Sequence, residues 1–278
     1  MFEAIDPGRI DPGMTNEDYH LAPEIGNSGL TGINRSVAHF LHSRAASDDA
    51  PLSAPLLEGQ AMHCRFLEPA DFDNRFAFCP AGLDRRTKAG KEAYREFLEE
   101  AEGKLILTDD QNQRGAEMAE LLNSHQRVSE LVDLKTGHAE VSIFWDHAGI
   151  GCKARPDYVS PDGKILVDLK TTVDASPETF AKSIVNFGYH RQAAWYLQGW
   201  RRVTGFHADF VFAVVEKQPP HGIACYTLDE AALAEGWLQC RNILAKYRSF
   251  LSEPEEARNA GYSTDIQELT LPRWAFQD

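Results

Sequence analysis

The sequence predicts an α/β protein, in which helices and strands surround one apolar core. Apolar residues recur at helical spacing on both sides of residues 138–170, whereas that middle segment follows the two-residue period of strands. At 278 residues, 43% of them hydrophobic, the chain is long enough to bury a substantial core. No stretch approaches the ~20 apolar residues of a membrane-spanning helix. We therefore expect no membrane association.

The part of the chain before the middle segment is predicted to be mainly helical. Ser28 is placed to cap the first helix, and Glu68-Pro69 ends the second. Thr108 or Asp109 is a suitable N-cap for the last. In order, we expect a helix over residues 28–43, a linker over 46–55, a helix over 56–67, a strand over 74–79 and helices over 88–100 and 109–124.

The middle segment predicts a meander of three strands. Residues 138–145, 151–159 and 164–170 have strand periodicity, and turn-forming residues separate them at 146–149 and at Pro161-Asp162-Gly163. Sequential strands joined by short turns usually pair with each other. We therefore expect the second and third strands to lie side by side.

After the meander, helices and strands alternate again. Ser176-Pro177 is typical of a helix start, with serine as the N-cap and proline at the first helical position. The expected elements are helices over residues 177–187 and 189–203, strands over 208–215 and 223–228, and a helix over 229–251. The apolar tail 269–274 is expected to dock. We predict a single domain over residues 1–278, with an N-terminal helix and linker (1–55), a catalytic core (56–253) and a docked tail (254–278).

Charge and cysteine content exclude several kinds of site. With 42 acidic and 28 basic residues the net charge is −14, so any affinity for DNA must come from local basic clusters. The same balance permits a carboxylate-lined site for a hard cation. The five cysteines include no C-x-x-C pair, which argues against zinc and iron–sulfur sites. Scattered cysteines and an N-terminus without a signal peptide predict a cytoplasmic location.

The sharpest local pattern is Val167-Asp168-Leu169-Lys170, preceded by Asp157. Residues two apart on a strand share a face, so Asp168 and Lys170 point the same way. If the two strands pair through the turn at 161–163, Asp157 lies beside Asp168. Two carboxylates then need a cation between them, and an adjacent lysine orients or helps to deprotonate an attacking water. The alternative is an ordinary ion pair on an edge strand.

Three further residues are candidates for the same site. Glu140 opens a strand that can reach the same sheet edge, or it is a solvated acid at a strand end. His63 lies on an otherwise apolar helix, where it is either a core histidine or a ligand for a cation or phosphate. Ser28 is either a helix cap or a phosphate contact.

Two patterns are candidates for DNA contact. Gln192 and Tyr196 are four residues apart on one helix face, where they contact a nucleotide or form half-buried polar packing. Residues 84–95 carry five basic and two acidic side chains, among them Arg85, Arg86, Lys88 and Lys91. This cluster either follows a phosphate backbone or is a solvated helix face.

Taken together and in order, these motifs resemble the nuclease domain of the RecE (exonuclease VIII) family, within the PD-(D/E)xK nuclease superfamily. The resemblance covers nearly the whole chain. The motifs that carry it are Asn16 to His20, Gly59 to Pro69, Arg86 to Lys91, Gly137 to Glu140, Arg155 to Asp157, Asp168 to Thr172, Tyr189 to Gln192 with Tyr196, and Leu269 to Ala275.

The resemblance implies a restriction-endonuclease-like core, with a central mixed β-sheet flanked by helices. It implies that Asp157 and Asp168 hold Mg2+ with the Leu169 carbonyl and His63, that Mn2+ is an alternative ion, and that Lys170 serves the attacking water. Glu140 becomes a further acidic residue of the site, and Gln192 and Tyr196 a helix motif near the DNA.

The resemblance further implies 5′→3′ degradation of linear double-stranded DNA from its ends. The product is a 3′ single-stranded tail for a RecT-like single-strand annealing protein, and the assembly is a toroidal tetramer. The second acid is Asp where many superfamily members have Glu, and no cysteine cluster matches the iron–sulfur members. An endonuclease on the same fold and a non-catalytic module that binds DNA ends are the alternatives.

Overall fold

A five-stranded mixed sheet forms the centre of the protein. The computed structural model describes residues 8–45, 53–78, 84, 86–255, 258–272 and 275–276. The strand order is β10 (Ile223–Tyr226), β9 (Asp209–Glu216), β8 (Ile165–Thr172), β7 (Tyr158–Val159) and β4 (His138–Ala139). Only β8 and β9 are parallel; the other pairs are antiparallel. This sheet is the expected mixed sheet of an α/β fold.

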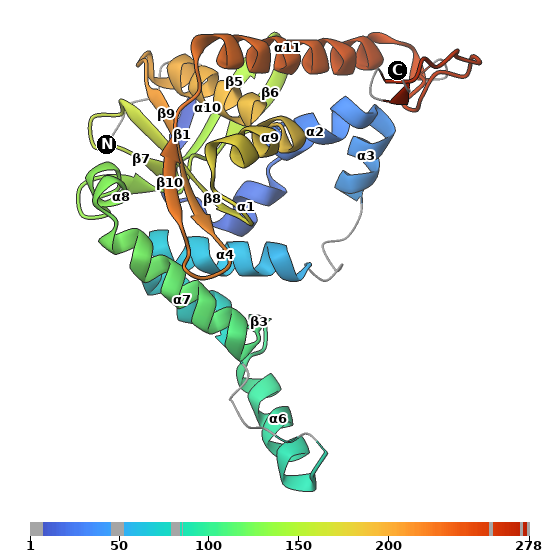
Figure 1. Ribbon diagram of the computed structural model, residues 1–278. Helices are drawn as coiled ribbons and strands as arrows, with labels where there is room; N and C mark the ends of the chain where they lie inside the picture. Colours follow the sequence, from blue (N-terminus) through green and yellow to red (C-terminus); the bar gives the residue numbers. More distant parts are fainter. Residues whose placement is uncertain are drawn as a thin grey trace.

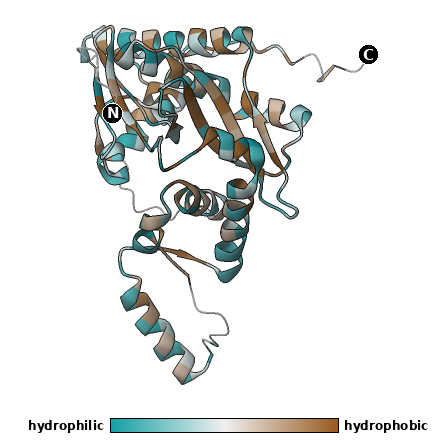
Figure 2. Ribbon diagram, turned by 90° about the vertical axis from the view of Figure 1, so that its left-hand side faces the viewer, coloured by the Kyte–Doolittle hydropathy of each residue, from teal (hydrophilic) through white to brown (hydrophobic). Residues whose placement is uncertain are grey.

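Helices cover both faces of the sheet (Figure 1). On one face lie α2 (Asn27–Arg35), α10 (Tyr189–Thr204) and α11 (Glu230–Ser252); on the other lie α4 (Ala54–Leu67), α7 (Asp109–Ser124) and α8 (Gln126–Leu131). Strand alternation explains the two cores, since Leu166 packs in the first and its neighbour Val167 in the second. Figure 2 shows the apolar strands between these helices.

A second, antiparallel sheet lies beside the central one. It consists of β1 (Arg9–Asp11), β5 (Ser142–His147) and β6 (Ile150–Ala154), in the order β1-β5-β6. Trp145 of β5 packs against Trp195 of α10, with ring centroids 4.8 Å apart. Because β5 follows β4 and β7 follows β6, the chain crosses between the two sheets twice in the middle segment.

The remaining elements are short or peripheral. Near the N-terminus are α1 (Asn16–Leu21) and α3 (Val37–Ala45), and η1 (Pro69–Asp71) and α5 (Phe72–Arg75) follow α4. β2 (Phe76–Phe78) pairs in parallel with β3 (Leu105–Leu107), and α6 (Lys88–Glu100) extends from this pair as an arm (Figure 1). α9 (Pro177–Phe187) precedes α10. No residue of α6 is buried.

Several predicted helices agree with the structure. Residues 88–100, 109–124 and 177–187 form helices with the expected bounds, and Thr108 caps α7. The first helix was predicted wrongly as continuous, because Ser36 has an extended backbone (φ −168°, ψ 157°) that separates α2 from α3. Ser28 is not the cap, since α2 begins one residue earlier and its N-cap is Gly26.

Two predicted strands are each divided. Residues 138–145 form β4 and β5, with Glu140 between them at a left-handed φ of 52°. Residues 151–159 form β6 and β7, separated at Pro156, which has no N–H to donate to a ladder. Hence the segment is not a simple meander. The predicted pairing across the turn at 161–163 is present, with Tyr158 opposite Val167.

The shorter predictions have mixed outcomes. Asn74, expected in a strand, lies in α5, because the strand begins at Phe76; Cys79 and most of the linker lie outside the described residues. In the described part of the tail, Ala260 packs against the core and accepts a 2.7 Å hydrogen bond from the Ala38 N–H. The apolar segment expected to dock does not, since the side chains of Leu269 and Leu271 are 86% and 60% exposed. Cys64, Cys152, Cys225 and Cys240 are free thiols. Among the residues that the structure describes, every helix is too short or too polar to cross a bilayer.

Candidate active site

Asp157, Asp168 and Lys170 converge at the β7–β8 pair. Asp157 precedes β7, and the register that pairs Tyr158 with Val167 places it beside Asp168. Its Oδ2 accepts a 2.6 Å hydrogen bond from the Leu169 N–H. Lys170 Nζ lies 2.5 Å from Asp168 Oδ2. The juxtaposition expected from strand geometry is therefore present.

His63 and Glu140 join Asp157 from two other elements. One donor atom from each residue lies within 4.8 Å of the others, so the three form a set that could hold a metal ion. His63 projects from α4, with Nδ1 3.5 Å from Asp157 Oδ2. Glu140 lies in the link between β4 and β5. A helix and two links between strands thus contribute one ligand group each.

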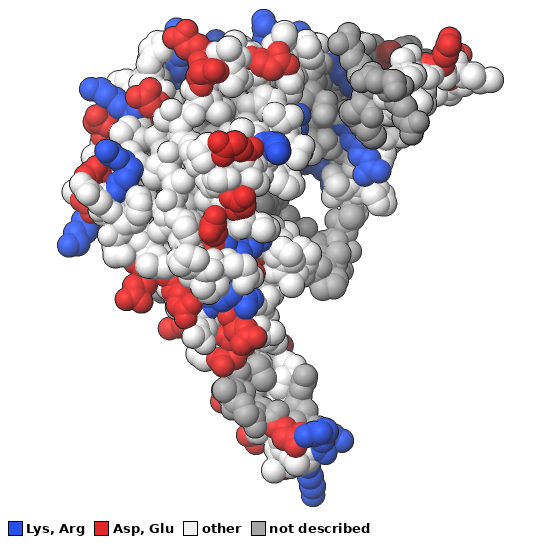
Figure 3. Space-filling view, viewed as in Figure 1, with Lys and Arg blue, Asp and Glu red and all other residues white. Residues whose placement is uncertain are grey.

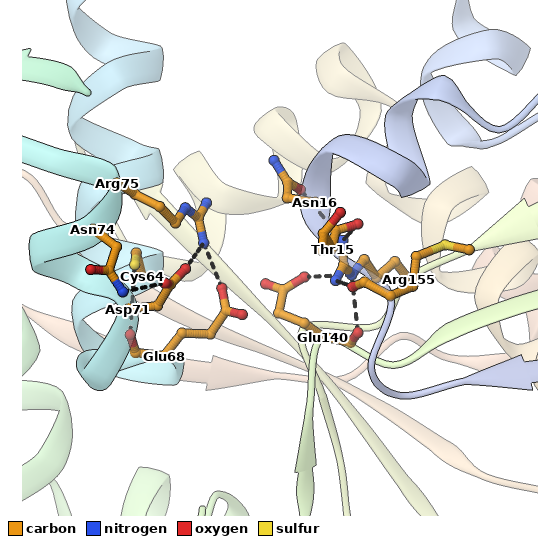
Figure 4. Close-up of polar contacts among 10 residues, drawn as sticks. Thr15, Asn16, Cys64, Glu68, Asp71, Asn74, Arg75, Glu140 and Arg155 are labelled. Atoms are coloured by element: carbon orange, nitrogen blue, oxygen red, sulfur yellow. Dashed lines mark hydrogen bonds and ion pairs between the residues drawn. The ribbon is translucent and has the colours of Figure 1, made fainter. Parts of the chain in front are cut away.

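Arg155 fixes the position of Glu140. Its buried guanidinium lies 3.1 Å from the Glu140 carboxylate and donates a 3.0 Å hydrogen bond to the Glu140 carbonyl. It also donates to the carbonyls of Met14 and Thr15, at 2.6 and 3.4 Å. Figure 4 shows this arginine between Glu140 and the segment before α1. The Glu140 N–H in turn donates to the Asp157 carbonyl at 2.9 Å.

Gln192 and Tyr196 lie behind Asp168 on α10. Gln192 Nε2 donates a 2.6 Å hydrogen bond to Asp168 Oδ1. The two residues are only 7% and 8% exposed, so their burial disagrees with the predicted direct contact with DNA. Their observed position supports the carboxylate instead. Tyr189, the first residue of α10, lies under Lys170, whose Nζ is 4.7 Å from the centroid of the tyrosine ring.

Burial raises the pKa of each of the three acids at the site, Asp157, Asp168 and Glu140. It raises the pKa of Asp157 and of Asp168 to about 6, although Lys170 opposes the shift. Burial and then repulsion by Asp157 raise the pKa of Glu140 to about 8. The site therefore disfavours uncompensated negative charge, as expected where a cation is to bind.

The two bases at the site respond in opposite directions. Burial and then the charge of Lys170 lower the pKa of His63 to about 4, which leaves a neutral imidazole with a lone pair for coordination. Burial lowers the pKa of Lys170, but attraction to Asp168 and Asp157 outweighs it and raises the pKa above its ordinary value. Lys170 is therefore a charged hydrogen-bond donor in this structure.

A cavity of about 300 Å³ opens onto these groups. Its lining includes His63, Glu140 and Lys170, together with residues that the sequence analysis had given no role: Asn16, His20, Gln60, Glu68, Arg75, Thr171 and Tyr189. Arg75 forms ion pairs with Glu68 at 2.7 Å and Asp71 at 3.8 Å, opposite the Glu140–Arg155 pair (Figure 4). All of these residues except Arg75 lie in motifs that carry the resemblance to the RecE family, so that resemblance was the signal that could have identified them.

The other predicted DNA-contact residues lie away from this cavity. Ser28 is in α2, and Lys88 and Lys91 are exposed on α6; none of them lines the cavity. The Arg86 side chain is 91% exposed and pairs with Asp84 at 3.0 Å. Figure 3 shows basic side chains at the distal end of the arm. Arg85 lies outside the described residues.

The donor set fits a divalent cation. Two carboxylates and a neutral imidazole suit ions that accept oxygen and nitrogen ligands. Asp168 Oδ2 is buried and makes no hydrogen bond, although it pairs with Lys170. A cation beside it would compensate this charge.

Comparison with known families matches residues 26–267 to the PDDEXK-like domain of unknown function (DUF3799). The chain belongs to this family. Membership agrees with the superfamily expected from the motifs, whereas the RecE branch is not distinguished by it. No curated protein matches the chain significantly.

Two solved structures are reported as similar to the chain. The crystal structure of a "Putative exonuclease" from Eubacterium rectale is 16% identical, with a TM-score of 0.59, and the alignment covers 93% of this chain and 96% of that one. That of a phage-related exonuclease from Haemophilus somnus 129PT is 13% identical and covers 69% and 93%, but its TM-score of 0.34 is too low to support an argument. The first comparison supports the fold.

Proposed function

We propose that the protein is a metal-dependent nuclease that hydrolyses phosphodiester bonds of DNA. The observation that carries the proposal is the convergence of Asp157 and Asp168 with His63, Glu140 and Lys170, of which the last three line one cavity. Membership of a PDDEXK-like family supports it. An ordinary ion pair on an edge strand would need neither the second carboxylate nor the imidazole.

Each residue has a distinct part in the proposed reaction. His63, Asp157, Glu140, Asp168 and the Leu169 carbonyl would hold the cation. When bound, that cation lowers the pKa of a water molecule and offsets phosphate charge. Lys170 donates a hydrogen bond that orients the attacking water, and its charge attracts the phosphate. Gln192 and Arg155 hold two of the carboxylates in place.

The finer properties rest on the resemblance to the RecE family. They are the use of Mg2+ with Mn2+ as an alternative, 5′→3′ action on linear double-stranded DNA, a RecT-like annealing partner, a toroidal tetramer and a cytoplasmic location. The name of the Eubacterium rectale protein supports exonuclease action. A phosphate-contact role for Lys88 and Lys91 belongs to the same proposal.

The test is digestion of end-labelled linear duplex beside closed circular DNA, with Mg2+, with Mn2+ and with chelator. We expect metal-dependent loss of linear DNA only, and no cleavage by Lys170→Ala or Asp168→Asn, with circular dichroism showing that both variants fold. Nicking of the circle would favour the endonuclease alternative. Binding of DNA ends without nucleotide release under any divalent ion would favour the non-catalytic module.

A further inference from the structure

A second cavity, of about 680 Å³, lies at the opposite end of α10 from the candidate active site. It is lined by Trp145, His147 and Ala148 of the β5–β6 hairpin, Gln198, Arg201 and Arg202 of α10, and Trp237 of α11. Gln192 and Arg201 are about 14 Å apart along the helix axis, at ~1.5 Å per residue. None of these lining residues touches the first cavity.

The cavity is strongly cationic within an acidic chain. Arg201 and Arg202 are exposed, and neither guanidinium forms an ion pair or hydrogen bond with a described residue. Burial, and then the charges of Arg248, Arg202 and Arg241, lower the pKa of His147, and Asp146 opposes this shift. A net charge of −14 makes such a cluster unusual. Unpaired arginines present planar donors that match phosphate oxygens.

Aromatic rings lie next to these cations. The rings of His147 and Trp237 meet edge to face, with centroids 5.4 Å apart. Trp237 is held in turn by Trp195, at 6.4 Å. Both Trp237 and His147 are half-buried, so part of each ring faces the cavity. Arginines beside a fixed aromatic ring are the combination with which proteins bind single-stranded nucleic acids, by charge on the backbone and stacking on the base.

We propose that this cavity binds a nucleotide unit, with its phosphate at Arg201 and Arg202 and its base against Trp237. The cavity volume lies within the range of small-molecule sites. The unit is either part of a single DNA strand or a free deoxynucleoside monophosphate. The choice of a deoxynucleotide over other aromatic phosphates rests on the proposed function; the site itself needs no cleavage.

The test measures binding of a fluorescent oligothymidylate in chelator, where cleavage is not expected. Trp237→Ala should weaken binding about 5- to 150-fold, the effect of one lost base stack. Trp237→Phe should retain binding, because it keeps a ring. Arg201→Ala/Arg202→Ala should also weaken binding and make it less sensitive to salt. Arg127→Ala, an exposed arginine on α8, is the matched control and should change little.

A second arm distinguishes the two sources of the nucleotide. Displacement of the oligonucleotide by thymidine monophosphate supports a free nucleotide, whereas displacement only by unlabelled oligonucleotide supports a strand. Binding that is equal in the wild type, the arginine double variant and Trp237→Ala would overturn the inference. Lys170→Ala separates the two proposals, since it should lose cleavage while its remaining binding keeps the same dependence on Trp237. An inactive wild type with intact, Trp237-dependent binding would refute only the nuclease proposal.

Discussion

The side-chain amide of Gln192 donates a 2.6 Å hydrogen bond to Asp168, and both residues are buried. This bond fixes one carboxylate oxygen while Lys170 approaches the other at 2.5 Å. A glutamine on the helix thus holds the carboxylate of a strand residue beside Lys170. The contact connects α10 directly to the proposed chemistry.

Gln192→Ala should therefore lower kcat with little change in KM, because Asp168 loses the group that orients it. We expect a reduction of roughly 10- to 100-fold, comparable to the loss of an outer partner of a metal ligand. Gln192→Glu should be worse, because a second acid would face Asp168. Gln113→Ala, which removes an exposed amide that donates to Glu117 on α7, is the control. Single-turnover cleavage rates provide the measurement, and equal rates for all variants would contradict the role.

Cation affinity should rise with pH between about 6 and 8. In the metal-free protein the pKa values of Asp157 and Asp168 are raised to about 6 and that of Glu140 to about 8, so protons compete with the cation below those values. Calorimetric titration with Mn2+ at several pH values measures the effect. Glu140→Gln removes the highest of these pKa values, so its affinity should level off at a lower pH. A pH-independent affinity would contradict the assignment.

Arg155→Met should destabilise the protein by about 3–5 kcal/mol, because it leaves Glu140 and two carbonyls without their buried partner. The Arg155 side chain is 7% exposed, so water does not screen this pair as it screens a surface pair. Arg127→Met breaks the exposed pair with Glu130 and should cost less than about 1 kcal/mol. Urea unfolding compares the two. Equal losses would show that Arg155 does not hold this region together.

Lys88→Glu/Lys91→Glu tests whether the arm contacts DNA. If each lysine contacts one phosphate, the slope of log affinity against log salt should fall by about 1 per residue. The fold should not change, because α6 contains no buried residue. Arg35→Glu/Lys135→Glu, at two exposed positions outside the arm, gives the same change of net charge and is the control. An unchanged slope would exclude the arm from the DNA interface.

The helices were the most predictable part of the fold. Thr108 and Pro177 are local start signals, and the structure uses both of them. The divided strands could not be predicted from periodicity, because the left-handed backbone at Glu140 depends on contacts between residues that are distant in the sequence. Arg155 donates hydrogen bonds to the carbonyls of Glu140 and Met14. Alternation alone also cannot show that consecutive strands enter different sheets.

The site was predictable where one hairpin builds it. Asp157, Asp168 and Lys170 follow from strand alternation and a turn. Other residues come from distant parts of the chain, so spacing carries no information about them: Tyr189 under the lysine is an example. For Gln192, spacing identified the correct helix face but could not show that the residue is buried.

Glu140 occupies a backbone conformation that favours glycine, with φ at 52°. A Cβ in this region costs roughly 1–2 kcal/mol. Glu140→Gly should consequently be more stable than Glu140→Ala by about 1 kcal/mol in urea unfolding, the reverse of the usual order, since both variants lack the carboxylate. The wild-type chain thus tolerates a locally unfavourable backbone geometry in order to present an acid at this point.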